Sequence, residues 1–177
     1  MSQQYFTDSE WETLLQAPVQ AAIGVTLVDK TDPVSFLNET RTAIQILAAE
    51  QQRQDISSDL ARSLVTSLKE EDAKEALQGD QLLLQKQFEL LGALQGLKSA
   101  SDGRKSTLEY FKQIESILAS KVTAVQAAEF KSWILSIARQ VAEAVKEGGL
   151  FGVGGERVSR EEAAMLSDME KALNFKS

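Results

Sequence analysis

Three features of the sequence predict an all-α fold, a compact bundle of six or seven helices with no sheet. The 177 residues include only two prolines, Pro18 and Pro33, so long stretches lack the residue that interrupts helices. Leucine, alanine, glutamine, glutamate and lysine, which favour helices, are abundant. Apolar residues recur every three or four positions, and no segment keeps the two-residue alternation of a strand. The length predicts a single helical domain, residues 1–177, with candidate lobes at residues 1–100 and 101–177.

The first helices are predicted from their caps and prolines. In "TDSE", Thr7 and the glutamate three residues later match a capping box, which starts a helix. Pro18 lies within the apolar stretch that follows, and we expect a kink or a restart there. The next helix has Pro33 at its first position, Asp32 as its cap and an end near Arg53.

The remaining helices are predicted from apolar stripes. One begins at Ser57 or Ser58, and the stretch "SASDGRKST" further on is predicted as a loop. Residues 127–145 leave only a narrow polar side, which predicts a central position in the bundle. The segment "QLLLQKQFELLGALQGLKSA" carries two adjacent stripes, which are Leu83, Leu90, Leu94 and Leu97, and Leu84, Phe88 and Leu91.

The composition excludes several kinds of chemistry. The chain has no cysteine and no histidine, so disulfides, thiolate catalysis, histidine metal sites and Ser-His-Asp triads are excluded. An enzyme with this composition would have to work with Asp, Glu, Lys, Arg, Ser, Thr or Tyr, and we favour a protein that is not an enzyme. The opening "MSQQYFTDSEWE" lacks the basic flank and apolar core of a signal peptide, and no stretch is long enough for a membrane span. Together with the absence of cysteine, this predicts a cytoplasmic protein.

The charge distribution bears on the partner. The net charge is −7, but residues 1–80 carry 14 acidic and six basic side chains, whereas residues 81–177 carry 12 and 13. An acidic chain without a basic patch argues against binding to nucleic acid. The imbalance is typical either of a solvated acidic surface or of contact between copies of the chain, and we expect a homo-oligomer.

The glycine-rich stretch "KEGGLFGVGGERVSREE", at residues 146–162, has two interpretations. The first is a connector between two helices, in which a glycine ends one helix and Ser159 caps the next. The second is an anion site formed by Arg157, Ser159 and Arg160, in which backbone amides at the start of a helix meet a negative charge. The spacing is not that of a phosphate-binding loop, and a helix rather than a strand precedes it.

Three acidic residues form a second candidate site. Asp29, Asp32 and Glu39 surround the predicted helix start in "DKTDPVSFLNE". Carboxylate oxygens of this kind bind hard cations such as Ca²⁺ or Mg²⁺. They are equally compatible with a helix cap and a solvated surface. No other cofactor is expected.

Two parts of the sequence resemble known families. Residues 129–173 resemble an uncharacterised bacterial helical family, in which a helix ending in A-E-A-x-K-E-G-G leads into a G-x-G-G turn and a V-S-x-x-E helix. The matching residues are Glu143, Lys146, Gly148, Gly149, Gly152, Gly154, Gly155, Val158, Ser159 and Glu162. The stretch "VTLVDKTDPVSFLNE" is similar to the tellurite-resistance TerB-like group, and this resemblance implies a cation held by Asp29, Asp32 and Glu39.

These observations lead to three functional hypotheses. The first is a non-enzymatic cytoplasmic interaction protein that forms homo-oligomers and acts in stress. The second is a TerB-like module that binds a divalent cation. The third is an enzyme or carrier whose anion site lies at the glycine turn.

Overall fold

The computed structural model is all-α, as the sequence predicts. It describes residues 2–26, 33–74, 100–147 and 158–176, together with residues 81, 84–86, 88, 89 and 92. Seven long helices pack together in this part of the chain, which contains no strand. They are α1 (Asp8–Leu15), α2 (Ala17–Thr26), α3 (Pro33–Gln52), α4 (Asp59–Lys74), α6 (Ala100–Lys121), α7 (Ala124–Glu147) and α8 (Arg160–Ala172), and a short 3₁₀ helix spans Ser2–Tyr5.

The two predicted helix starts at capping boxes are confirmed. The Thr7 amide donates to the Glu10 carboxylate over 2.8 Å, and the Glu10 amide donates to the Thr7 hydroxyl over 3.2 Å. The first of these bonds lowers the pKa of the Glu10 carboxyl. Ser159 and Glu162 make the same reciprocal pair before α8. Each box therefore satisfies amides that the first turn of its helix leaves free.

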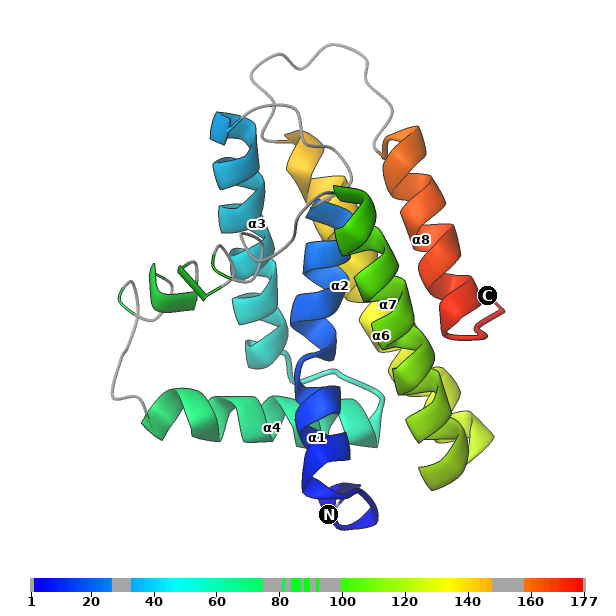
Figure 1. The fold of residues 1–177 in the computed structure, drawn as a ribbon. Coiled ribbons are helices and arrows are strands. Elements are labelled where there is room, and N and C mark those ends of the chain that lie inside the picture. Colours follow the sequence, from blue (N-terminus) through cyan, green and yellow to red (C-terminus); the bar gives the residue numbers. More distant parts are fainter. Residues whose placement is uncertain are drawn as a thin grey trace.

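Helices α2 and α7 lie side by side at the centre of the bundle (Figure 1). The chain restarts at α2 one residue after α1 ends, close to Pro18, which confirms the predicted restart. Most of α2 is buried, because it contacts α1, α3, α6, α7 and α8. Helix α7 contacts α2, α3, α4, α6 and α8, which confirms the predicted central position of residues 127–145. Helices from both candidate lobes thus pack directly on one another.

Helix α3 begins at Pro33 and ends at Gln52, as predicted. The prediction of which face of this helix is buried is partly wrong. The sequence predicts that Arg41 lies on one apolar stripe of this helix with Val34, Leu37, Ile44 and Ala48, but Arg41 is exposed. The face turned inward carries Thr40, Ala43 and Ile44, and it also buries Glu50, whose carboxylate has partners inside the protein. A stripe drawn from hydrophobicity alone misses polar residues that are buried with partners.

The prediction of a loop at residues 99–107 is also wrong. Helix α6 begins at Ala100, so "ASDGRKST" is helical. Two interactions account for this: Asp102 lies in the first turn, where a negative charge stabilises the helix dipole, and Arg104 pairs with Asp168 of α8. Tertiary contacts therefore outweigh the local preference of serine and glycine for a loop.

The contact of α2 with α6 and α8 is especially close. Gly24 lies at this contact, and a methyl group placed on it would come within 2.4 Å of Met169 Cε and 2.8 Å of Thr107 Cγ2. Met165 and Met169 are fully buried there. Figure 1 shows α8 running beside α6 at one side of the bundle, opposite α3. We refer to the meeting of α2, α6 and α8 around Gly24 as the Gly24 contact.

Candidate functional site

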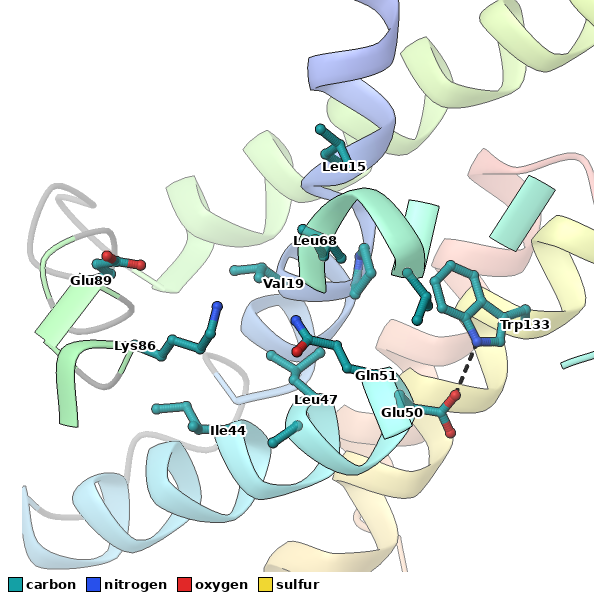
Figure 2. A pocket seen from close by; sticks show the side chains of 13 residues that line it. Leu15, Val19, Ile44, Leu47, Glu50, Gln51, Leu68, Lys86, Glu89 and Trp133 are labelled. Carbon is teal, nitrogen blue, oxygen red and sulfur yellow. Dashed lines mark hydrogen bonds between the residues drawn. The ribbon is translucent and has the colours of Figure 1, made fainter. Parts of the chain in front are cut away.

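An apolar pocket opens on the side of α2 that faces α3 and α4 (Figure 2). Its volume is about 150 Å³. Most of the walls come from α2, α3 and α4, which contribute Pro18, Val19, Ile44, Leu47, Val65 and Leu68, and Leu15 of α1 and Trp133 of α7 complete them. On α3, Leu47 and Ala48 follow Ile44 by three and four positions, so both lie on the same face of that helix as Ile44. The pocket is therefore a product of helix packing between segments that are distant in the sequence.

A buried carboxylate lies at the inner end of this pocket, at Glu50, which is 3% exposed. Its Oε2 accepts a hydrogen bond from Trp133 Nε1 over 3.0 Å, drawn in Figure 2 as a dashed line. Its Oε1 accepts one from Gln140 Nε2 over 3.0 Å. Arg53 Nη1 donates to both oxygens, over 3.1 and 3.2 Å. The carboxylate of α3 is thus joined to two residues of α7 and to the end of its own helix.

The Glu50 carboxylate is paired with a cation of the protein, Arg53. Arg53 also pairs with Asp55 over 2.8 Å, and the hydrogen bonds with Asp55 and Glu50 raise the pKa of the guanidinium. The same bond lowers the pKa of the Asp55 carboxyl. A carboxylate has about four acceptor positions, and Glu50 uses four. We interpret this network as a structural link between α3 and α7, since it leaves no acceptor for a ligand.

A further helical segment, which includes residues 84–86, 88 and 89, contributes polar side chains to the pocket lining. Lys86 and Glu89 line the pocket, and Lys86 Nζ pairs with Asp72 of α4 over 2.7 Å. Figure 2 shows the Lys86 ammonium directed toward the pocket. Leu84 and Phe88, from the same segment, are 54% and 71% exposed. We call these two residues the exposed stripe; the segment presents polar side chains to the pocket and apolar ones to solvent.

The predicted anion site is described only in part, because Arg157 lies outside the described residues. Ser159 is the N-cap of α8, and Arg160 is the exposed first residue of that helix. The Ser159 amide donates to the Glu162 carboxylate over 2.7 Å, and the Ser159 hydroxyl accepts from the Glu162 amide. The protein's own carboxylate therefore occupies the position that an anion would take at this amide. The connector formed by the glycines also lies outside the described residues.

The predicted cation site is likewise described only in part. Asp29 and Asp32 lie outside the described residues, so the structure does not place them relative to Glu39. Glu39 is on α3 and is 8% exposed. Among the residues that the structure places, no three acidic side chains gather closely enough to hold a metal ion. Binding of Ca²⁺ or Mg²⁺ by Asp29, Asp32 and Glu39 stays a prediction.

Sequence reasoning did not find the pocket or the Glu50 network. One local signal was present: Glu50 lies three residues after Leu47 and seven after Ala43, on the buried side of α3, with Arg53 one turn later. A charged pair continuing an apolar face suggests a buried ion pair. Trp133 and Gln140 are distant in the sequence, and no local pattern indicates that they meet Glu50.

Comparison with known proteins gives no family. No family model, curated protein or solved structure matches this chain. The resemblances of residues 129–173 and of the "VTLVDKTDPVSFLNE" stretch stay predictions. Within the described helices, none is both long and apolar enough to cross a membrane. The structure therefore shows an all-α bundle with an apolar pocket beside α2.

Proposed function

We propose that this chain is a non-enzymatic interaction protein that binds an apolar helix through the pocket between α2, α3 and α4. One observation carries the proposal: an apolar pocket of about 150 Å³ opens beside three exposed apolar side chains, Val19, Leu84 and Phe88. Exposed apolar surface of this kind is typical of interaction sites. Pockets that receive a helix take anchor residues spaced three or four apart along one face.

The size of the pocket indicates which anchor it takes. A dry protein cavity of about 150 Å³ lined by aliphatic side chains accommodates a benzene molecule. The pocket here has the same volume and mostly apolar walls, so one phenyl ring fits it. A phenylalanine on the apolar face of a helix is therefore the group that the pocket would receive. Burying such a side chain contributes about 1.5–3 kcal/mol.

The polar groups near the pocket support binding rather than catalysis. Glu50 already accepts four hydrogen bonds, and Lys86 is paired with Asp72. A general base needs an acceptor position within reach of the substrate proton, and Glu50 has used its own. Trp133 presents its ring to the pocket while its N–H is held by Glu50. These groups fix the walls of the pocket in place.

The test is a titration with a labelled peptide. The probe is a dye-labelled amphipathic helical peptide with one phenylalanine on its apolar face, and the matched probe has alanine at that position. We expect fluorescence anisotropy to show binding of the phenylalanine peptide and binding at least about tenfold weaker for the alanine peptide, which corresponds to about 1.4 kcal/mol.

A pair of valine variants locates the site. Val19→Glu puts a charge at the edge of the pocket, where Val19 is 38% exposed, and should abolish binding of the phenylalanine peptide. Val125→Glu makes the same substitution at a valine that is 68% exposed and lies on α7 away from this pocket, and it should leave binding unchanged. Equal binding by both variants would show that the pocket is not the binding site.

A further inference from the structure

A second hollow is lined by the chain that follows α3, by α7 and by the residues that follow α8. Its volume is about 500 Å³, within the range of about 300–1,000 Å³ that is typical of small-molecule sites. We propose that this hollow, which we call the Phe175 pocket, binds a small organic cation of the quaternary ammonium type. Trp133 lines both the Phe175 pocket and the pocket beside α2 that carries the proposed function, but their other described lining residues differ.

The Phe175 pocket has largely apolar or small walls. Ala128, Ser132 and Ser136 follow one another at intervals of four along α7, so they share one face of that helix. Their short side chains leave room beside the helix, which Ile56 and Phe175 border from outside α7. Methyl groups attached to a positively charged nitrogen gain from contact with such walls, because their surface is removed from water.

The charges around the Phe175 pocket leave it negative. Arg53 lines the pocket, but its guanidinium is already bound to the carboxylates of Glu50 and Asp55, over 3.1 and 2.8 Å. Glu129 also lines the pocket, and no ion pair joins it to a cation within the part of the chain that the structure describes. Three carboxylates therefore face one guanidinium, and a bound cation would reduce the excess of negative charge.

The basic residues nearby in the sequence do not remove this excess. Lys131, two residues after Glu129, is paired with Glu115 of α6. Lys176, which follows Phe175, is exposed and does not line the pocket. An anion would have to compete with two carboxylates of the protein for the guanidinium and would lie near a third, so the charges favour a cation.

Two aromatic side chains in the lining favour an organic cation in particular. Phe175 is half-buried, and Trp133 is held by the hydrogen bond from its Nε1 to Glu50 over 3.0 Å. A cation within about 6 Å of a ring centre is attracted by the ring, and quaternary ammonium ligands are recognised in this way. A metal ion such as Ca²⁺ needs six or more oxygen ligands, which one carboxylate and a few hydroxyls do not supply.

The test compares choline with its neutral isostere, the alcohol in which a carbon atom replaces the nitrogen. Both have the same shape, so only the charge differs. We expect isothermal titration calorimetry to show binding of choline that is at least about tenfold tighter than binding of the alcohol. Equal affinities for the two, or no binding of choline at millimolar concentration, overturns the proposal.

Three variants locate the cation. Glu129→Gln keeps the shape of the side chain and should weaken choline binding by about tenfold, with no effect on the alcohol. Phe175→Leu keeps an apolar side chain and should weaken choline binding by about threefold. Glu143→Gln is the matched control, at an exposed position on α7 outside the pocket, and should change nothing. Circular dichroism checks that each variant is folded. Equal choline affinities for Glu129→Gln and Glu143→Gln overturn the proposal.

Val19→Glu separates this site from the pocket beside α2. It should abolish binding of the phenylalanine peptide and leave choline binding unchanged, because Val19 lines only the pocket beside α2 among these two. Loss of choline binding in Val19→Glu would place the cation in the pocket beside α2 and overturn the proposal. If choline binds as expected and the peptide does not bind the wild-type chain, the proposed function fails and the cation site stands.

Discussion

The two sides of α2 meet the rest of the protein in opposite ways. At the Gly24 contact, α2 lies so close to α6 and α8 that an added methyl group would collide with Met169 and Thr107. On the other side, Val19 borders a pocket of about 150 Å³ that opens to solvent. One helix of ten residues therefore has one face without spare volume and one face with room for a phenyl ring.

This difference indicates where the protein can bind a partner. A fully packed contact stabilises the fold and cannot receive another group without rearrangement. A pocket with rigid walls keeps its apolar surface available for a partner. Here the walls are held by the Glu50 network, which joins α3 to α7. The Gly24 contact and the Glu50 network thus hold in place the helices that form the pocket.

The largest expected effect is the loss of that network. Glu50→Ala removes the acceptor for Trp133, Gln140 and Arg53, and leaves buried donors without partners. We expect the free energy of unfolding to fall by about 3 kcal/mol, as measured by urea denaturation. Gln51→Ala, one residue further along α3 at the pocket edge, is the matched control. It should lower the free energy of unfolding by about 0.5 kcal/mol. Similar losses for both would mean that the network is not what holds α3 on α7.

A smaller effect is expected at the Gly24 contact. Gly24→Ala gains up to about 1 kcal/mol from helix propensity but overpacks the contact by about 2 kcal/mol. The net result should be a loss of about 1 kcal/mol in thermal or urea unfolding. Gly92→Ala is the control, because Gly92 is helical and a methyl group there would have nothing within 4 Å. Stabilisation by Gly24→Ala would contradict the close packing.

How far the sequence predicts the structure depends on the range of the interactions. Both capping boxes, the restart near Pro18 and the bounds of α3 follow from residues within four positions of one another. The prediction of a loop at residues 99–107 was wrong because Arg104, near the start of α6, pairs with Asp168, which is 64 residues away. The pocket was not predicted, since residues of five separate helices line it and its empty volume leaves no local pattern.

Filling the pocket should separate stability from binding. Ala48 lines the pocket on α3, and Ala48→Leu places apolar atoms in its volume without adding charge. We expect the free energy of unfolding to rise by about 0.5 kcal/mol, because cavity filling is stabilising. Binding of the phenylalanine peptide should be lost. A stabilised variant that still binds would show that the ring is received elsewhere, whereas Val125→Leu, away from the pocket, should leave binding unchanged.

The smallest effect concerns the packed side and its dependence on pH. The hydrogen bond from Arg104 lowers the pKa of the Asp168 carboxyl below its ordinary value of 3.8. The pair therefore contributes stability that is present above pH 3.8 and is lost as the pH falls through the lowered pKa. Because both side chains are partly exposed, we expect about 0.3 kcal/mol. A double-mutant cycle with Arg104→Gln and Asp168→Asn, measured by urea unfolding, should give this coupling at neutral pH and none in strong acid. A coupling that persists in acid would show that the ion pair is not its source. The contact between α6 and α8 would then be stabilised by packing alone.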